Sequence, residues 1–536
     1  MSNGGVFQII TNDGKQDRML MATALLNRRL ALIEDARSKD PTVSDPTPTL
    51  LDIEKTHVLF MNASFKPFAA IGYEYQKVSS QSGSLSLGSS NITFSLPTYG
   101  DFISDMCVHA TVTAPTFAKG GNTIVPSGRW CAYPGLRLLQ RVEFAVSGNP
   151  LDAYTQDSAL MFNCFNVSRD SRAAFDRCVG QQIPMDGYLA QKDLTADGLA
   201  ISTNAPSHQA KVDVTNGYQT WKPSGSVSNL DIYIPLLFWF NRDPRLAVPS
   251  VALPHANRYI NVNLASQAQM FDLNGNGNAA APAFSVSASV SVLELWVNNI
   301  FVNPEVHDIF IKRIGFSLIR VHREHVQQVT QGSGRVLLSH LKWPIECMFV
   351  GFRRTYYEAP RDTPTVYNGD KWHKFAHLNA TSSFGLAGAA SVGAGPAFSA
   401  VAPVISAYNW MRMINTLTIS AHGVPLYNAM AGMFLDSYVP YRYSSTGVST
   451  TADVGPMLIN FCLFPGSYQP SGHINVSRAR EFYLEYTTAQ DESSVDIIGS
   501  GALAATGATS ATLVVIASAI NFLLISDGSA VLRYTT

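Results

Sequence analysis

Apolar side chains recur at every second position in many short stretches of the chain, which is the period of a half-buried β-strand. Pro97 and Pro115 each close such a stretch, as expected where a strand leaves its sheet. Stretches of this kind lie at residues 92–96, 106–112, 139–146, 230–240, 259–264, 284–302, 311–321, 336–343, 345–352 and 417–419. Many strands of modest length, with few helices between them, predict an all-β sandwich, barrel or jelly roll.

Helical patterns are expected in only two places. Residues 16–37 combine leucines with arginines as one amphipathic helix, and the proline-rich residues 41–48 follow as a stiff linker. This segment is either an arm that docks on a neighbour or a membrane surface, or a helix that packs on its own domain. A second helix is expected at 156–165, within residues 153–223, which we interpret as an external loop. Residues 353–403 are interpreted as a second such loop.

Residues 468–483 break the strand pattern in an unusual way. Ile474 begins an alternation that then places Arg478 and Arg480 on the apolar side, before Phe482 resumes it. Two arginines on the core face of a strand are costly unless they are paired or the strand bends. The pattern therefore predicts a two-part strand with a polar waist. The arginines form either an ion-pair network that holds the strand register or a solvated bulge.

A weak internal repeat divides the chain. The segment Gly148-Asn149-Pro150-Leu151 resembles Gly423-Val424-Pro425-Leu426, and each follows an apolar strand. Further anchors match at a constant separation of 223 residues: Phe238 with Phe461, Val251 with Ile474, Leu253 with Val476, Tyr259 with Phe482, and Val292 with Val515. The repeat predicts two similar all-β domains in tandem. We place the boundaries at 1–49 for the N-terminal arm, 50–303 for the first domain and 304–536 for the second.

The charge balance limits the partners that the chain can have. Formal net charge is −1 and only 14% of the residues are charged, against roughly 25% in average soluble domains. Without a basic excess, direct nucleic-acid binding is not expected. A surface so poor in charge fits either a protein buried among copies of itself or a neutral, Ser/Thr/Asn-rich exterior.

Targeting and redox signals are absent from the sequence. The six cysteines show no Cys-x-x-Cys spacing, so neither a zinc site nor a disulfide framework is indicated. The longest apolar run, residues 514–525, is shorter than the roughly 20 residues that a membrane-spanning helix needs. No signal-peptide pattern opens the chain, and we expect a soluble, cytosolic protein with reduced thiols.

Candidate chemical sites are few. His322 and His325, and likewise His373 and His377, are spaced as metal ligands could be, but the zinc-protease pattern His-Glu-x-x-His is absent. The nucleophile elbow Gly-x-Ser-x-Gly and the Walker phosphate loop are also missing, and the Gly-rich residues 385–395 are interpreted as a flexible loop. We therefore predict no catalytic, cofactor-binding or metal-binding residues. The function should reside in the protein's surfaces.

Several long segments resemble one protein family closely. They are Asn62-Ala63-Ser64-Phe65-Lys66-Pro67, Tyr99-Gly100-Asp101-Phe102, Phe316-Ser317-Leu318-Ile319-Arg320-Val321-His322, Lys342-Trp343-Pro344-Ile345-Glu346 and Trp372-His373-Lys374-Phe375, together with residues 468–483 and 518–534. In these segments the chain resembles the major capsid proteins of African swine fever virus and related large DNA viruses. The segments lie near both ends and in the middle, so the resemblance extends over nearly the whole chain.

The resemblance implies an all-β tandem double jelly roll, two eight-stranded β-sandwiches with long inserted loops and an N-terminal helical arm. It also implies a non-enzymatic shell protein that forms homotrimers, the pseudo-hexagonal capsomers (hexons) of an icosahedral capsid. Its expected partners are neighbouring capsomers, minor capsid and penton proteins and, through the arm, an inner viral membrane or its proteins. The expected location is the virion, assembled in viral factories of the host cytoplasm.

A different function stays open at this point. Tyr356, Tyr357 and Tyr367 lie in the second expected loop, where exposed aromatic side chains could bind sugars. The alternative is therefore a carbohydrate- or receptor-binding jelly-roll protein that acts through its loops.

Overall fold

The computed structural model divides the chain into two compact units, Met1–Ala70 and Ile71–Thr536. The residues that it describes are 29, 31–35, 71–81, 85–89, 91–119, 127–181, 222–223, 227–253, 256–274, 284–302, 315–358, 371–380, 408–451, 453–477, 479, 481–490, 496–499, 510–526 and 529–534. In the first unit, residues 29 and 31–35 are helical and fall within the helix expected at 16–37. The rest of the expected arm lies outside the described residues.

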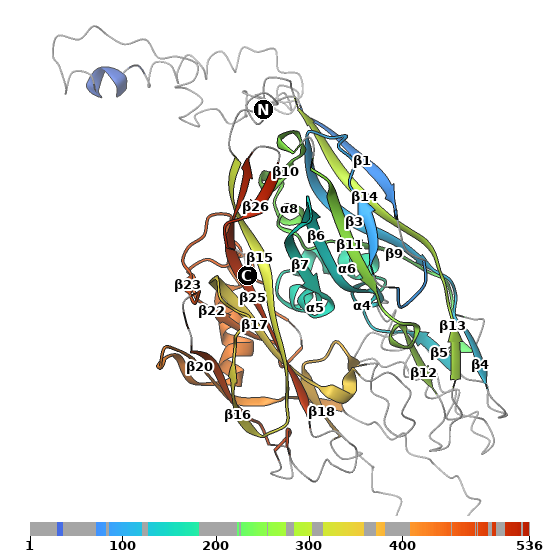
Figure 1. Ribbon diagram of the computed structural model, residues 1–536. Helices are drawn as coiled ribbons and strands as arrows, with labels where there is room; N and C mark the ends of the chain where they lie inside the picture. The colour runs from blue at the N-terminus through green and yellow to red at the C-terminus, as the bar shows by residue number, and fades with distance from the viewer. Residues whose placement is uncertain are drawn as a thin grey trace, which may run out of the picture. The chain divides into compact units, whose positions relative to one another are not determined.

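The strands before residue 303 form two main sheets (Figure 1). One contains, in hydrogen-bonding order, β1 (Ile71–Ser79), β14 (Val290–Val302), β3 (Phe102–Val112) and β10 (Val248–Pro249), with β9 (Leu230–Pro235) also paired with β3. The other contains β2 (Ile92–Ser95), β11 (Arg258–Leu264), β6 (Leu139–Val146) and β7 (Asn149–Thr155). Because β9 and β10 pair with opposite ends of β3, they form one interrupted strand, and each sheet has four strand positions. This is an eight-stranded jelly roll.

The strands after residue 315 repeat this arrangement. One sheet contains β15 (Gly315–Val329), β25 (Ala511–Ser526), β17 (Pro344–Arg354) and β22 (Met457–Asn460), with β23 (Ile474–Asn475) also on β17 and β26 (Ser529–Leu532) on β25. The other contains β16 (Ser333–Leu337), β24 (Phe482–Thr488), β20 (Ile414–Ala421) and β21 (Val424–Ala431). The predicted double jelly roll is confirmed.

Two matching turns fix the correspondence between the halves. Ser147 and Gly148 connect β6 to β7 with φ of 50° and 82°, and His422 and Gly423 connect β20 to β21 with φ of 53° and 76°. Two consecutive positive φ angles make the tight hairpin turn that suits the twist of antiparallel strands. The 275-residue match of Gly148 with Gly423 is therefore correct.

The 223-residue separation brings β11 opposite β24, but it is one residue out of register at Tyr259. Arg258 pairs with Val146 just before the first turn, and Phe482 pairs with Ala421 just before the second. Sheet position therefore matches Phe482 with Arg258, a separation of 224 (482 − 258), and not with Tyr259. Tyr259 is half-buried on the outward side while Phe482 is buried. A slip of one residue moves a side chain to the other face of a strand, so matching by aromatic type was misleading.

The predicted two-part strand at 468–483 is in fact a crossover. β23 ends at Asn475 in the sheet of β17, and β24 begins at Phe482 in the opposite sheet. The polar waist between them carries the chain from one sheet to the other, and β10 and β11 make the same crossover in the first half. Arg478 and Arg480 lie outside the described residues, so the ion-pair hypothesis for them stays a prediction.

Short elements fill the ends and sides of the two sandwiches. The strands are β4 (Thr116–Lys119), β5 (Ser127–Trp130), β8 (Lys222–Pro223), β12 (Phe271–Asn274), β13 (Phe284–Ser287), β18 (Ala376–Ala380) and β19 (Tyr408–Arg412). The α-helices are α4 (Pro134–Leu138), α5 (Gln156–Phe165), α6 (Arg169–Cys178), α8 (Trp239–Arg242), α9 (Gln267–Met270) and α11 (Val439–Tyr443). The 3-10 helices are η1 (Pro244–Leu246), η2 (Ser250–Ala252), η3 (Thr355–Tyr357) and η6 (Ser444–Thr446), and η5 (Phe434–Tyr438) is a π-helix.

Two expected strands are shorter than predicted. The strand at 230–240 ends at Pro235, and α8 begins four residues later. The strand at 336–343 ends at Leu337, because the N–H of Leu341 turns back to the carbonyl of Leu338. Beyond these strand ends, Leu236, Phe238, Leu338 and Leu341 are buried as expected, but they lie in turns and helices rather than in strands.

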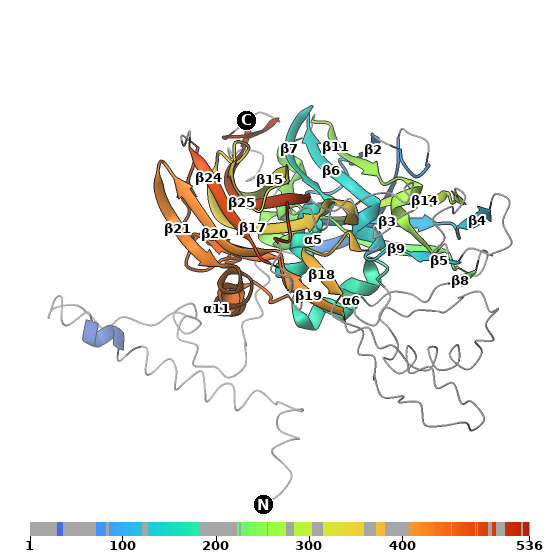
Figure 2. The ribbon, with the colours of Figure 1, turned by 90° about the horizontal axis from the view of Figure 1, so that it is seen from below.

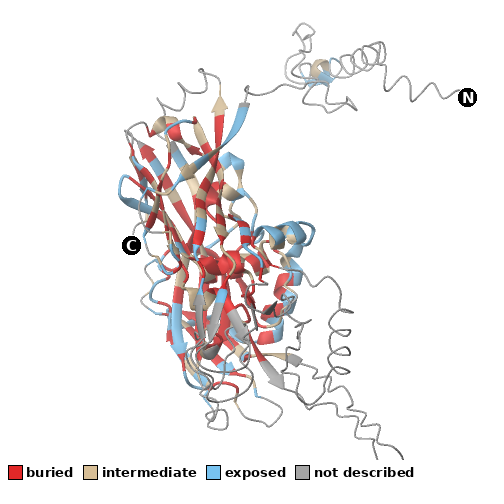
Figure 3. Cartoon of the chain, turned by 90° about the vertical axis from the view of Figure 1, so that its right-hand side faces the viewer, coloured by how far each residue is buried: buried red, intermediate tan, exposed pale blue. Residues whose placement is uncertain are grey.

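Each sandwich buries the apolar side of its alternating strands (Figure 3). Along β3, Met106, Val108 and Ala110 are buried, while the residues between them are half-buried. Most of the long apolar run at 514–525 in β25 is buried, because the opposite sheet of the sandwich covers one face and α5 of the first jelly roll packs on the other. Among the described residues, no helix has the length and apolar character needed to cross a membrane.

Candidate assembly surfaces

The four large sheets follow one another in a row (Figures 1 and 2). At one end lies the β16–β24–β20–β21 sheet, then the β15–β25–β17 sheet, then the sheet of β7, and at the other end the β1–β14–β3–β9 sheet. The first and second jelly rolls therefore meet between β7 and β15. This internal contact shows how one jelly roll binds the next, and the two ends of the row show what is left uncovered.

The internal contact is built by β7 and α5 of the first jelly roll. The hydroxyl of Thr155 donates to Glu324 Oε2 (2.6 Å), and the backbone N–H of His322 donates to Asp152 Oδ1 (3.3 Å). Both acceptors and both donors come from the facing strands β7 and β15. The edge strand of one sandwich is thus held against the larger sheet of the other.

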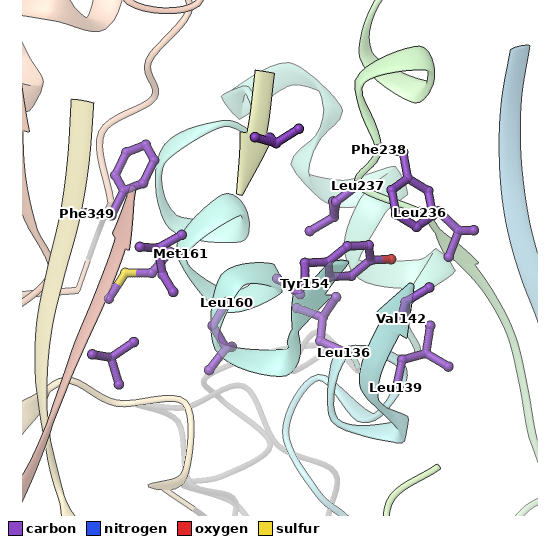
Figure 4. Close-up of a cluster of buried hydrophobic side chains, with 14 of the residues drawn as sticks. Leu136, Leu139, Val142, Tyr154, Leu160, Met161, Leu236, Leu237, Phe238 and Phe349 are labelled. Atoms are coloured by element: carbon purple, nitrogen blue, oxygen red, sulfur yellow. The ribbon is translucent and has the colours of Figure 1, made fainter. Parts of the chain in front are cut away.

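Helix α5 supplies the apolar part of the same contact. Phe165 stacks on Phe349 of β17 with ring centroids 5.0 Å apart, and both side chains are buried. Figure 4 shows Met161 of α5 lying close to Phe349. Gly351 of β17 permits this approach, because a Cβ there would lie 2.5 Å from the Met161 Cε atom. The helix was expected at its observed bounds, but its interpretation as part of an external loop is wrong, since most of α5 is buried.

A buried ion pair anchors the helix. Arg353 of β17 donates to both carboxylate oxygens of Asp157, with Nη1–Oδ1 and Nη2–Oδ2 distances of 2.7 and 3.1 Å. Arg353 also pairs with Glu358 and donates to the carbonyl of Trp372. A bidentate pair of this kind sets orientation as well as energy, so it fixes how α5 lies on the sheet.

Burial perturbs two titratable groups at the contact. It raises the pKa of Glu324 to about 7, so this carboxyl holds its proton far above the usual range. Burial, and then the guanidinium of Arg242, lower the pKa of His322. Arg242 Nη2 donates to His322 Nε2 at 2.5 Å, which also requires a neutral imidazole. A pocket of about 40 Å³ lies beside this pair, between α5 and the sheet of β17.

At the end of the row that belongs to the first jelly roll, the outward side of the β1–β14–β3–β9 sheet is aromatic and acidic. We call it the outer face and define it by Tyr73, Tyr75, Lys77, Asp105, His109, Asp231, Tyr233, Glu294 and Trp296. His109 stacks on Tyr233 (4.4 Å between ring centroids) and donates to Asp231 Oδ1 (2.7 Å between heavy atoms). Tyr233 meets Trp296 edge-on at 5.5 Å, and the hydroxyl of Tyr75 donates to Asp105.

At the end of the row that belongs to the second jelly roll, β21 and the helical turns after it form an apolar surface. We call residues 424–443 the end segment. Its exposed apolar side chains are Val424, Leu426, Met433, Phe434, Tyr438 and Tyr441. These are six of the 18 large apolar side chains that are exposed among the described residues, gathered in 20 positions. Such a concentration is typical of a surface that another protein covers.

The two pairs of histidines considered as metal ligands lie in different parts of the second jelly roll and do not form a metal site. His322 and His325 lie on β15, where His322 faces Asp152 and His325 lies edge-on to His340. His373 and His377 are not on a helix: His373 precedes β18 and His377 lies within it. No group of three or more His, Cys, Asp or Glu side chains that could hold a metal ion occurs in the part of the chain that the structure describes. No disulfide joins any of the six cysteines, all of which lie in the described part of the chain.

Of the three tyrosines behind the carbohydrate hypothesis, the structure describes the side chain of Tyr357 alone. Tyr357 is fully buried, at 0% exposure. The side chain of Tyr356 and the whole of Tyr367 lie outside the described residues. Tyr357 belongs to η3, which directly continues the buried strand β17, and this is why the loop expected from residue 353 onward begins inside the core.

Comparison with known proteins covers both jelly rolls. The family model described as "Major capsid protein N-terminus" matches residues 72–303, and the one described as "Large eukaryotic DNA virus major capsid protein" matches residues 301–531. The hexon protein p72 of African swine fever virus (strain Badajoz 1971 Vero-adapted) is 32% identical over 667 aligned residues, which cover 100% of both chains.

Solved structures agree. The Faustovirus major capsid protein has a TM-score of 0.65 and 31% identity, and the match covers 96% of this chain and 100% of that one. A chain of the quasi-atomic PBCV-1 capsid has a TM-score of 0.60 at 21% identity, covering 89% of this chain and 100% of that one. The second likeness supports the fold.

Proposed function

The chain belongs to the family of large eukaryotic DNA virus major capsid proteins, and from this premise we propose that three copies close head to tail into one capsomer. It is a structural protein of the virion capsid, it is not an enzyme, and it associates with copies of itself. The step beyond family membership is the number of copies and the way in which they join. Six similar jelly rolls, two from each of three chains, would make a pseudo-hexagonal unit.

The observation that carries the proposal is the pair of unmatched ends. Within one chain, the β7 side of the first jelly roll binds the β15 side of the second. In the second jelly roll, β21 is the counterpart of β7 and is left uncovered. In the first jelly roll, β1 is the counterpart of β15 and is left uncovered. Unlike surfaces that fit each other generate a ring when the rotation closes. Three chains supply three such junctions between chains, in addition to the three within them.

The two jelly rolls also support a boundary near residue 303 between the proposed domains, 50–303 and 304–536. In the described residues, no sheet combines strands from the two sides of residue 303. The two family models likewise meet near that residue. The contact between the halves nevertheless holds residues 71–536 in a single compact unit, so we propose two domains that fold against each other.

The N-terminal arm, residues 1–49, is proposed to face the interior of the shell. Its amphipathic pattern fits a membrane surface or a membrane-associated minor capsid protein. Contacts with penton proteins and assembly in host cytoplasmic factories belong to the same proposal, through the resemblance to the family. Deleting residues 1–45 should leave capsomers intact and impair shell assembly; normal shells from the truncated chain would refute the role of the arm.

The solution mass of the purified chain tests the proposal. A trimer has three times the 58.2 kDa of a single chain, and light scattering separates it from a monomer or dimer. Negative-stain images should show hexagonal particles. A stable monomer or dimer across the micromolar range would refute the three-chain ring.

The carbohydrate-binding alternative has no support. The relatives of this chain by sequence and structure are capsid proteins, and Tyr357, one of the three tyrosines behind the alternative, is buried. We do not propose it further.

A further inference from the structure

We infer that the end segment of one chain docks on the outer face of the next, with Arg442 directed at the acidic side chains of that face. This inference rests on the proposed three-chain ring and adds which surfaces of the chain meet. It commits both exposed ends of the molecule to a single occupant, a second copy of this chain.

The internal contact provides the template. In the first jelly roll, the turn at Gly148 is followed by edge strand β7 and then by helix α5, which lies on the sheet of β17. In the second jelly roll, the turn at Gly423 is followed by edge strand β21 and then by the helical turns η5 and α11. The end segment is thus the counterpart of β7 and α5. It should bind the counterpart of the β15–β25–β17 sheet, which is the β1–β14–β3 sheet.

Burial differs between the counterparts in the way this requires. Leu151 of β7 is buried, whereas Leu426, which lies at the same distance from its turn in β21, is 40% exposed. On the contact side of β15, His322 is buried and Glu324 is half-buried, whereas Tyr73 and Tyr75 of β1 are 64% and 56% exposed. Each strand that the internal contact covers therefore has an uncovered counterpart. The first jelly roll has four exposed large apolar side chains in its described part: Tyr73, Tyr75, Tyr99 and Tyr233.

All four of these tyrosines lie on or beside the same sheet. Tyr73 and Tyr75 belong to β1 and Tyr233 to β9, while Tyr99 packs edge-on against Phe301 of β14 at 5.3 Å between ring centroids. Three of the four, Tyr73, Tyr75 and Tyr233, therefore lie on the outer face, where the end segment is expected to dock. Aromatic side chains and arginine are the types that most often anchor protein interfaces.

Charge complements the apolar match. Asp105, Asp231 and Glu294 lie on the outer face, accompanied by Lys77 and His109. The end segment has two charged residues, Asp436 and Arg442. Asp436 is buried and accepts a hydrogen bond from Arg412 at 2.5 Å.

Arg442 is the one charge that the end segment offers to a partner. It is exposed and forms no ion pair with the other residues that the structure describes. An exposed arginine opposite a partly acidic face sets the register of an interface more than its strength.

The decisive test is site-specific cross-linking within isolated capsomers. Tyr438 is replaced by the photoreactive residue p-benzoylphenylalanine, and cross-linked peptides are identified by mass spectrometry. We expect links between chains to peptides of β1, β3, β9 or β14. The matched control places the same residue at Leu337, which is exposed on β16 at the opposite edge of the same sheet, and should give no links to those peptides.

Charge reversal gives an independent readout. Arg442→Glu should raise the dissociation constant of the trimer about tenfold, and Asp231→Lys in the same chain should recover most of that loss. Arg335→Glu on β16 is the control and should leave the constant unchanged. Trimers whose Tyr438 links map away from the outer face would overturn this inference while the three-chain ring stands. Failure of the unmodified chain to form trimers at all would overturn the ring itself.

Discussion

β7 and β21 occupy the same position in their jelly rolls, yet one is a covered strand and the other an open one. β7 carries Asp152 and Thr155, whose oxygens bond to β15. β21 carries Val424 and Leu426, which are exposed in the single chain. The difference shows that one version of this contact is formed within the chain, while the surfaces for a second version are left exposed. The contact within the chain should govern the stability of the single chain, and the exposed surfaces should govern its assembly.

The largest expected effect separates these two roles. Phe165→Ala removes a fully buried ring that stacks on Phe349, so it should lower the free energy of unfolding by about 3–5 kcal/mol. Tyr441→Ala, in the end segment, removes a ring that is 71% exposed and should change the stability of the single chain by less than about 0.5 kcal/mol. Chemical denaturation at a concentration where the chain is monomeric measures both. Equal losses from the two substitutions would end the comparison, and only Tyr441→Ala should reduce trimer formation without loss of stability.

The next effect depends on pH. Glu324 keeps its proton in the folded chain up to a pKa of about 7, whereas the unfolded chain loses it near 4.5. The stability that this group contributes is therefore fully present below pH 4.5 and is lost as pH rises through 7. The change amounts to about 3 kcal/mol.

A Glu324→Gln variant removes that dependence. Its unfolding free energy should lack the decline between pH 4.5 and 7, and above pH 7 it should exceed that of the unmodified chain. Glu485→Gln on β24, at a side chain that is 44% exposed, serves as the control and should leave the decline in place. Denaturation curves from pH 4.5 to 8 provide the measurement, and an unchanged decline in Glu324→Gln would contradict the assignment.

The smallest effect tests the correspondence itself. Gly148 and Gly423 have φ of 82° and 76°, and a Cβ at either would meet no atom within 4 Å. Replacing either by Ala should therefore cost only the backbone strain of a left-handed residue, about 1 kcal/mol. Thermal unfolding of the two variants should give matching shifts. A clearly larger shift for one of them would show that the two turns are not equivalent.

Much of the fold could be predicted because strand periodicity depends on burial of one face. The stretches at 106–112 and 259–264 became β3 and β11, and the Gly148–Gly423 match located the same turn twice. Alternation alone does not fix which residue of one strand matches which residue of another. For this reason the sequence matched Phe482 with Tyr259, 223 residues away, whereas the sheets match it with Arg258, 224 residues away.

The assembly surfaces could not be predicted in the same way. The bounds of α5 follow from its residues, but nothing in that segment reveals that a second jelly roll covers it. The apolar positions Val424 and Leu426 look like ordinary core residues of a strand, because the sequence does not show which edge of a sheet is left open. The signal that was available is the run of aromatic residues in 434–443, which is denser than one short helical stretch needs.

The most direct test of the account is a cryo-electron microscopy reconstruction of the purified capsomer. We predict three chains related by threefold symmetry, with residues 424–443 of each chain lying on the outer face of the next and Tyr438 and Tyr441 buried there. A particle in which the outer face of one chain meets the outer face of another, or in which residues 424–443 face solvent, would contradict it.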